Sequence, residues 1–555
     1  MTRLLARPLL ALLLVVALSG SGRAQGTPYV AMLDAAYEDL DALIASGLVR
    51  ELMVGERPYS QASFRRFVLE AVRRRAGREA SAGAASVRPA STRALSTRAL
   101  SAREVEALAR LEARFGGTPA KVGTAFQRAP FTGTVALASS PTRAMRVNGA
   151  PAGSQIDADL NPLLQRNQGR VLLDGLTASM EGGVTATRGP FAAEATARAW
   201  AGIPQGQPAN AGLDLVAGYG RAVWGPVAFD LGRTAYVVGY GPYGGSMYST
   251  NARALDQARL RAEYPVRLPW VLRHLGLWQG TFALANLGQN RDNRGGTLLT
   301  MRLTGRPSQY LEWGLTYQNQ HDGTGVKPSH QYQRLEEIIF VFSGQEWQVT
   351  DRAVAAEVRL ALPQTRSALY ANFLSTDDRN RFRLHSGGYW EDAVWIGGFE
   401  QRGMGRDGRL DVRLEGRHTG PIPHSHGQFT SGMTEDQRTI GDAMGPNSEG
   451  LALTGTWNGS KSRLSVEAAI ERYTIDIYAM FSSPTPRFGY GDDWRLAHDE
   501  PDEFRQRLTV SWMSHAAWRG YQPTVRAGYE RIQRFNWVDK TRHAAVLELS
   551  LRPFR

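Results

Sequence analysis

The sequence predicts an all-β protein: an outer-membrane transmembrane β-barrel of about 18 antiparallel strands, preceded by a small periplasmic helical bundle. Three observations lead to this prediction. Apolar and polar residues alternate in many short segments from about residue 130 to the C-terminus. The first 24 residues have the pattern of a secretory signal. No later segment has 18 consecutive apolar residues, so the sequence offers no candidate for a membrane-spanning helix.

Residues 1–24 are expected to be a signal peptide. Arg3 and Arg7 give a basic start, and the apolar run 9–18 is too short to span a bilayer. Gly22 and Ala24 are small residues at the two positions that a signal peptidase reads, which predicts cleavage after Ala24.

Residues 25–118 are expected to form a periplasmic bundle of three short amphipathic helices. The first helix has a single apolar stripe, and Gly47 suits its end. The stripe is made of Leu33, Tyr37, Leu40 and Ile44.

The other two helices have capping signals at their starts. Ser60 can cap the second helix, and Ser101 with Glu104 forms a capping-box pair for the third. The Ala/Arg/Ser-rich stretch 76–100 lies between these helices and repeats Ser-Thr-Arg-Ala-Leu in tandem. Its five-residue period matches no helix face, so we interpret it as a flexible linker.

Residues 119–555 are expected to form the barrel. In the last strand, from Ala545 to Phe554, Leu547 and Leu549 alternate with Glu548 and Ser550. This two-residue period predicts a strand with one apolar face. In a soluble sandwich the apolar face would join a core, whereas in a membrane barrel it would meet lipid and the polar face would line the lumen. The export signal and the number of strands favour the barrel.

The lengths of the connections support a barrel, because outer-membrane barrels have long outer loops and short periplasmic turns. The expected long, outer connections are 140–169, 200–211, 241–251, 287–296, 321–350, 375–390, 420–449, 481–503 and 535–540. The expected short, inner ones lie near residues 189, 225, 270, 307, 363, 404, 458 and 518.

The amino-acid composition limits the classes of molecule that the protein is expected to bind. The chain of 555 residues carries a formal net charge of +13 and has no cysteine, which excludes disulfides, thiolate metal sites and a lipoprotein anchor. Positive charge that is spread along the strands of an exported chain argues against nucleic acid. The expected partners are an anionic polysaccharide and the outer-membrane lipid with its lipopolysaccharide phosphates.

Two outer connections combine residue types that bind sugars, because aromatic faces stack on sugar rings and polar side chains bond hydroxyls. The carbohydrate-binding candidates are Phe488, Tyr490, Asp492, Asp493 and Trp494 in one connection, and Trp537 and Asp539 in the other. The alternative is that these aromatics belong to the girdle at the outer membrane interface.

The remaining sequence patterns give only weak support for a metal site, a nucleotide site or a catalytic site. We therefore expect neither a metal nor a cofactor. The acidic group at 492–503 lacks EF-hand spacing, and His418, His424 and His426 lack a further ligand at defined spacing. The string 239–244 fits a dinucleotide fingerprint, but Pro242 and the residues after it do not open a helix. No catalytic constellation stands out.

Four segments resemble, in order, motifs of the Wzi family of capsule assembly proteins. They are Tyr37-Glu38-Asp39-Leu40 with Arg57-Pro58-Tyr59-Ser60; Gly241-Pro242-Tyr243-Gly244-Gly245 with Asn251-Ala252-Arg253; Met301-Arg302-Leu303 with Leu311-Glu312-Trp313-Gly314; and Arg438-Thr439-Ile440-Gly441-Asp442. The resemblance departs from the family at Asp442, where many members have histidine.

The resemblance implies a non-enzymatic outer-membrane barrel that binds, assembles or retains capsular or extracellular polysaccharide at the cell surface. We expect the periplasmic helices to dock to polysaccharide export components. The alternative is a porin-type diffusion channel for small polar or anionic solutes, because a barrel of this size is wide and has polar inward faces. A hydrolase or acyltransferase is a third hypothesis, for which no Ser/His/acid set can be placed.

Overall fold

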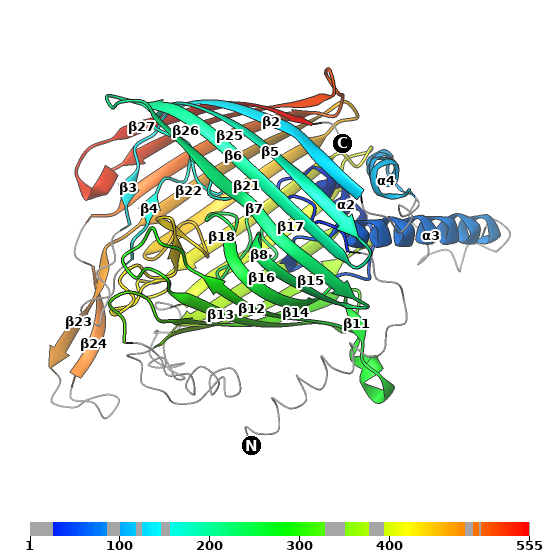
Figure 1. Ribbon diagram of the computed structural model, residues 1–555, viewed down its shortest axis with the longest axis horizontal. Coiled ribbons are helices and arrows are strands. Elements are labelled where there is room, and N and C mark those ends of the chain that lie inside the picture. Colours follow the sequence, from blue (N-terminus) through cyan, green and yellow to red (C-terminus); the bar gives the residue numbers. More distant parts are fainter. Residues whose placement is uncertain are drawn as a thin grey trace.

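The computed structural model describes residues 26–85, 100–117, 125–145, 156–327, 350–376, 393–482, 492–498 and 501–553. Within these ranges, 18 strands close into one antiparallel barrel, with β27 paired to β2 (Figure 1). The predicted fold class is therefore confirmed. The strands are β2 (Ala125–Ser139), β5 (Gly175–Arg188), β6 (Phe191–Pro204), β7 (Asn210–Trp224), β8 (Val227–Thr234), β10 (Leu255–Ala262), β12 (Leu277–Asn286), β13 (Thr297–Arg306), β14 (Leu311–His321), β15 (Thr350–Leu362), β16 (Ser367–Thr376), β17 (Ala393–Met404), β18 (Leu410–Thr419), β21 (Ser448–Asn458), β22 (Ser462–Tyr473), β25 (Glu503–Ser514), β26 (Tyr521–Gln533) and β27 (Arg542–Pro553).

The apolar face of the strands lies on the outside of the barrel. In β27, Leu547 and Leu549 are exposed, whereas Glu548 and Ser550 are buried in the lumen. The same arrangement holds in β22, where Leu464 and Ile470 are exposed. An apolar exterior around a polar, charged interior is the arrangement of a barrel that spans a membrane.

Most connections alternate in length as the sequence predicts, but the expected long outer connection 200–211 is only the five residues 205–209, no longer than the inner connection 405–409. Turns such as 189–190, 225–226 and 459–461 join strands at one end, here called the inner end. The long connections, among them 235–254 and 420–447, leave from the opposite, outer end. The inner connection between β10 and β12 is unusually long. It begins with β11 (Val266–Arg267), which pairs with β12 and so continues β10. It then forms the exposed 3₁₀ helix η2 (Trp270–Leu275).

Three outer connections fold back into the lumen and fill its outer half. We call the described residues of 140–174, 235–254 and 420–447 the outer-loop plug. It contains five two-residue strands: β3 (Arg143–Ala144), β4 (Asp159–Leu160), β9 (Val237–Val238), β19 (Thr434–Glu435) and β20 (Arg438–Thr439). Met247, Met433 and Ile440 of the plug pack against the inward side chains of Leu374 and Ile396. This buried apolar cluster fixes the plug to the barrel wall.

A fourth outer connection stays outside the lumen. It forms the hairpin of β23 (Asp476–Ser482) and β24 (Asp492–His498), which stands beyond the outer end (Figure 1).

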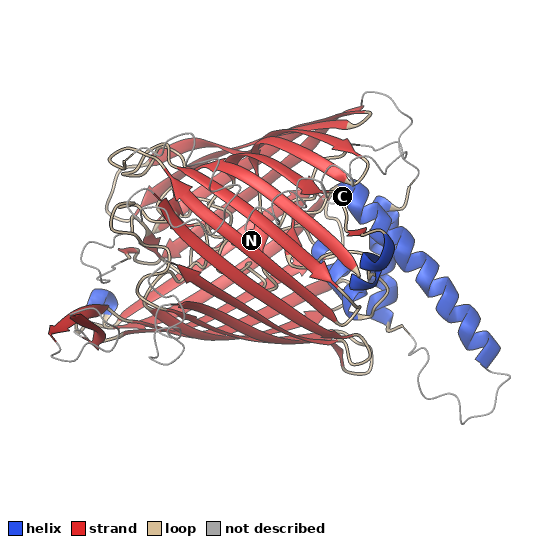
Figure 2. Cartoon of the chain, turned by 90° about the horizontal axis from the view of Figure 1, so that it is seen from below, coloured by secondary structure: helices blue, strands red, loops and turns tan. Residues whose placement is uncertain are grey.

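The helices gather at the inner end, opposite this hairpin (Figure 2). They are α2 (Ala36–Ala45), α3 (Gln61–Ala85) and α4 (Ala102–Phe115). We call residues 26–85 and 100–117 the helical domain. Its core buries Leu40, Phe64 and Leu108. In the described part of the chain, no helix is both long and apolar enough to cross a membrane.

The helix starts and ends predicted from the sequence are present in the structure. Ser101 and Glu104 form a capping box, and the Ser60 hydroxyl accepts a hydrogen bond from Ser63 N at 3.0 Å. Gly47 takes a positive φ of 71° at the end of α2. Residues 1–25, 86–99 and 118–124 lie outside the described residues, so the signal peptide, most of the linker and the exact domain boundaries stay predictions.

Two features of the helical domain differ from the expectation. Helix α3 continues to Ala85, ten residues into the stretch that we interpreted as a linker, because its Ala, Arg and Glu residues favour helix. The domain is also not a free bundle. Residues 56–57 form β1 (Glu56–Arg57), which pairs with β9 of the outer-loop plug, so the domain reaches inside the barrel.

Candidate functional site

The predicted sugar-binding residues fall in two places at the outer end. Asp492, Asp493 and Trp494 begin β24, opposite Ser482, Phe481 and Met480 of β23. Phe488 and Tyr490 lie outside the described residues. The hairpin that carries this group stands beyond the end of the barrel opposite the helices (Figure 1).

Trp537 and Asp539 lie in the connection between β26 and β27. Asp539 is exposed, but Trp537 is only 8% exposed. The guanidinium of Arg143 lies 4.3 Å from the centroid of the Trp537 ring, and burial lowers the pKa of Arg143 to about 10. One face of this indole is therefore covered, which the sequence could not indicate because Arg143 is far away in the chain.

The residues of the second and fourth family motifs tie the outer-loop plug together. Asn251 Nδ2 donates to the carbonyl oxygen of Thr439 at 3.0 Å, and Ser249 N donates to Ile440 O at 2.9 Å. A Cβ on Gly441 would overlap the carbonyl oxygen of Ser246, so glycine is needed where these two connections cross.

Charged motif residues extend this network. Arg438 donates to Asn167 Oδ1 at 2.8 Å and to Arg170 O at 2.9 Å, which joins 420–447 to 140–174. Burial, reinforced by Arg198 and Arg170, lowers the pKa of Arg438 to about 10. Arg253 pairs with Glu435 at 2.6 Å.

The glycines of the Gly-Pro motif lie where another part of the chain comes too near to leave room for a side chain. Gly244 has a φ of 103° and Gly245 crosses the backbone of Val238. A Cβ on Gly241, next to Pro242, would lie 2.6 Å from a carboxylate oxygen of Glu415. These residues let the connection fold tightly inside the barrel.

The third family motif holds the helical domain from the barrel wall. Glu312 accepts hydrogen bonds from Val54 N and Gly55 N, and Arg302 donates to Gly55 O at 3.2 Å while pairing with Glu357 at 2.6 Å. A Cβ on Gly314 would lie 2.6 Å from Arg302 Nη2, so Gly314 leaves room for the guanidinium. The motif residues are thus structural: they fasten the outer-loop plug and the helical domain.

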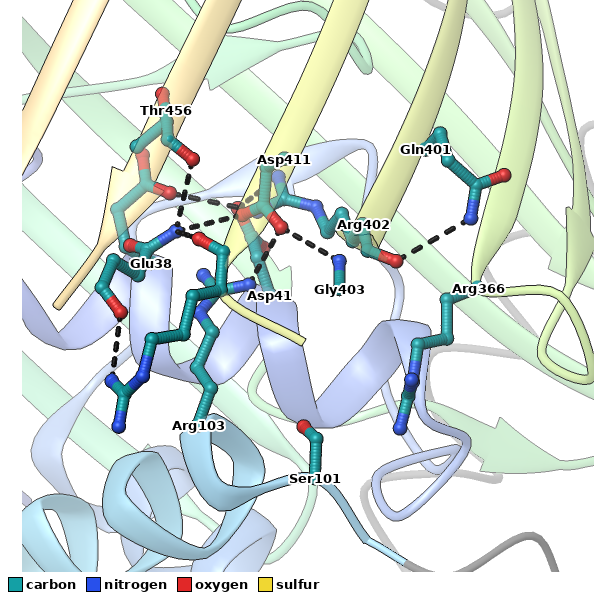
Figure 3. Close-up of polar contacts among 12 residues, drawn as sticks. Glu38, Asp41, Ser101, Arg103, Arg366, Gln401, Arg402, Gly403, Asp411 and Thr456 are labelled. Carbon is teal, nitrogen blue, oxygen red and sulfur yellow. Dashed lines mark hydrogen bonds and ion pairs between the residues drawn. The ribbon is translucent and has the colours of Figure 1, made fainter. Parts of the chain in front are cut away.

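Further ion pairs lock α2 and α4 to the wall. Arg402 of β17 lies 3.5 Å from Glu38, 3.4 Å from Asp41 and 3.6 Å from Asp411, and Arg103 of α4 pairs with Asp411 at 2.7 Å (Figure 3). Although burial raises the pKa of Glu38, its neighbours Arg463 and Arg402 outweigh burial and hold the pKa well below its usual range.

Sequence reasoning missed this docking network. The sequence shows a polar face on α2 and inward charged residues on β17 and β18. It does not show that these two sets of side chains form ion pairs with each other, because they lie far apart in the chain. The motif residues were identified only as a resemblance, without the contacts that explain them.

Between the outer-loop plug and the helical domain the lumen keeps two adjoining cavities of about 540 Å³ and 410 Å³. Their linings share Asp34, Glu38, Asn167, Arg170, Arg463 and Arg552. We call the two cavities together the lumen chamber. It is lined by arginine and carboxylate side chains from α2, α4, the outer-loop plug and the wall.

The three histidines of one region do not converge. His418 bonds Glu449 at 3.0 Å, His426 accepts from Gln428 N, and buried His424 has its pKa lowered to about 4 by burial. In the described ranges, no group of three or more histidine or carboxylate side chains could hold a metal ion. Asp442, the departure from the family pattern, accepts from Arg417 at 2.7 Å.

Comparisons with known proteins found a matching family and a similar solved structure that covers nearly the whole chain. The family model described as capsule assembly protein Wzi matches residues 149–546. The solved structure of Wzi from Escherichia coli is described as an outer-membrane protein involved in group 1 capsule assembly and as a carbohydrate-binding β-barrel. It is 14% identical, with 95% of this chain and 99% of that chain covered and a TM-score of 0.64.

Two other solved barrels show weaker similarity. OccK5 (OpdH) of Pseudomonas aeruginosa is 9% identical, with 77% of this chain and 98% of that chain covered and a TM-score of 0.41. OprD of the same organism is 8% identical, with 76% and 94% covered and a TM-score of 0.39. No curated protein sequence matches the chain.

Proposed function

This chain belongs to the Wzi family of capsule assembly proteins, and from that membership we propose that it binds capsular or extracellular polysaccharide and retains or assembles it at the cell surface. It works in the outer membrane, with the helical domain on the periplasmic side, and it catalyses no reaction.

The observation that carries this proposal is that the lumen is occupied from both ends. The outer-loop plug is fastened by Asn251, Arg438 and Gly441, and the helical domain is fastened by Arg302 and Glu312. A barrel whose outer end is closed by the plug and whose inner end is braced by the helical domain serves as a rigid base for what its outer surface presents. That surface includes the β23–β24 hairpin and the connection with Asp539.

Retention follows from many weak contacts along one polymer. A polysaccharide repeats the same sugars, so several loop contacts of low affinity, and several copies of the protein, give a strong combined hold without one tight site. Aromatic residues of the outer connections, above all Trp494 and Tyr490, stack on the sugars, and Asp492, Asp493 and Asp539 bond hydroxyl groups.

Other partners contact other surfaces. The exposed apolar strand faces meet outer-membrane lipid, and basic residues at the outer rim meet lipopolysaccharide phosphates. Helix α3 extends away from the barrel (Figure 1), and we propose that it contacts polysaccharide export components in the periplasm.

The decisive experiment measures how surface polysaccharide is divided between cells and medium, with and without the gene. We expect the polymer to be made in equal amounts but shed into the medium when the gene is deleted. An unchanged division would contradict the proposal. Complementation with the full-length chain restores retention if the effect belongs to this protein.

A diffusion channel is the second candidate, and the lumen chamber favours it because polar space remains inside the barrel. Conductance of the purified protein in planar bilayers separates the two. The closed barrel predicts no steady open pore, whereas steady conductance that solutes block would establish the channel.

A further inference from the structure

We infer that the lumen chamber is an anion-binding vestibule entered from the inner end, and that it takes carboxylate or phosphate groups carried by small solutes or short sugar chains. This site is separate from the outer surface on which the proposed function rests. The first support is its charge. The two cavities are lined by 13 different arginines and nine different carboxylates, and by no lysine.

The excess of positive charge is concentrated where the outer-loop plug meets strands β26 and β27. Arg170, Arg526 and Arg552 gather there around the carboxylate of Glu548. Arg170 lies 2.5 Å and Arg526 3.7 Å from Glu548 oxygens. Arg552 donates only to the carbonyl oxygen of Leu33, at 2.9 Å, and has no carboxylate within 4 Å in the described part of the chain. Asp34 and Glu181 also act on the Arg552 charge, but each is already paired, with Arg114 at 2.7 Å and with Arg198 at 2.8 Å. The five guanidinium groups of this region therefore outnumber its three carboxylates, which leaves room for an added anion.

Unpartnered groups on the lining are of one chemical kind. Six buried polar atoms of the lining have no hydrogen-bond partner in the described ranges, and each of them can donate: Arg166 Nε, Gln168 Nε2, Tyr236 Oη, Tyr240 Oη, Arg413 Nε and Thr524 Oγ1. No carboxylate oxygen of the lining is among them. Because these atoms are buried behind the lining, they make the chamber electrostatically favourable for a ligand rich in acceptor oxygens without contacting it directly.

The larger cavity reaches the inner end of the barrel. Its lining includes Asn458, His515 and Pro553, which lie at the inner ends of strands, and Arg114 of α4. Toward the outer end the lining stops at residues of the outer-loop plug such as Ile440. The chamber is therefore a blind space whose entrance lies beside the helical domain.

Two substitutions with opposite expected effects test the inference. Arg552→Gln removes the guanidinium without a carboxylate partner and should weaken anion binding about tenfold, the typical effect of one charge-assisted hydrogen bond. Glu548→Gln removes the competing carboxylate and should tighten binding. A purely structural role of these groups would move the affinity in neither direction. Arg233→Gln is the control, because Arg233 pairs with Asp256 away from the chamber.

The measurement is isothermal titration calorimetry on the full-length protein in a non-ionic detergent at low salt. The probes are inorganic phosphate, trigalacturonate and, as a neutral control, maltotriose. Binding of both anions assigns the site to the shared charged group. Binding of phosphate alone assigns it to small ions, and binding of trigalacturonate alone assigns it to acidic sugars.

Three results would overturn the inference: no heat from either anion, equal binding of maltotriose, or affinities that are the same in Arg552→Gln, Glu548→Gln and Arg233→Gln. Polysaccharide retention on cells is scored separately for the same variants. Loss of anion binding with normal retention would separate this site from the proposed function.

Discussion

Glu312 of β14 accepts hydrogen bonds from the backbone N–H of Val54, at 2.8 Å to one carboxylate oxygen and 3.0 Å to the other. The same carboxylate accepts from Gly55 N at 2.9 Å. One barrel residue thus holds the segment that leads from α2 into β1, which pairs with the outer-loop plug. The helical domain and the outer-loop plug are thereby parts of one assembly inside the barrel.

Glu312→Gln should loosen the helical domain. The substitution keeps the size of the side chain but replaces charge-assisted hydrogen bonds by weaker ones, at a cost of about 2 kcal/mol in the free energy of docking. Hydrogen exchange at Val54 and Gly55 should accelerate, and planar bilayers should show more frequent openings. Glu79→Gln is the control, because Glu79 pairs with Arg75 on the exposed surface of α3, and an exposed pair contributes little. Unchanged protection of the Val54 amide would show that the contact is not needed.

Gly441→Ala should destabilise the outer-loop plug. The added methyl group would overlap the carbonyl oxygen of Ser246, and the two connections would have to separate, at a cost of about 1–3 kcal/mol. Heat modifiability on gels should show conversion at a lower temperature than in the wild type. Gly455→Ala is the matched control, because nothing lies within 4 Å of its Cβ. Equal conversion temperatures for the two variants would contradict this packing argument.

The stability of the protein should fall in mild acid because of His424. Burial lowers its pKa from 6.5 to about 4 in the folded protein, so the unfolded chain binds the proton first. Stability is therefore lost as the pH falls from 6.5 toward 4, by about 2–3 kcal/mol for a shift of this size.

Urea unfolding at pH 7 and at pH 4.5 checks this prediction. His424→Gln should be less sensitive to pH than the wild type over this window. If the wild type and His424→Gln lose the same stability between the two pH values, other groups are responsible.

The barrel could be predicted because its signals are local. Alternation such as that of Leu547 and Glu548 identifies both the strand and its two faces within a few residues. Short inner turns and long outer connections then order the strands. The capping box at Ser101 is equally local, and it begins α4 as expected.

The docking of the helical domain and the filling of the lumen could not be predicted in this way. Arg103 and Asp411 pair at 2.7 Å although they are 308 positions apart, and neither segment contains a sign of the other. Similarly, the composition around Trp537 suggested a sugar-stacking surface, but the Arg143 guanidinium that covers one face comes from a distant connection. Patterns along the chain indicate which side chains point inward, and only the closed barrel indicates which of them meet.

The β23–β24 hairpin should contribute more to glycan binding than the charges of the lumen. The double variant Trp494→Ala and Tyr490→Ala removes two aromatic side chains. Each aromatic ring that stacks on a sugar contributes about 1 kcal/mol to the free energy of binding. Binding of purified surface polysaccharide should weaken about tenfold or more, because the two losses add in free energy. Trp518→Ala is the control, since Trp518 is an exposed indole on an inner connection, at the opposite end of the barrel. The affinity is measured by biolayer interferometry with immobilised polysaccharide. If the hairpin variant binds as tightly as Trp518→Ala and the wild type, the sugar contacts lie on another outer connection, and Trp537→Ala with Asp539→Ala becomes the variant that decides.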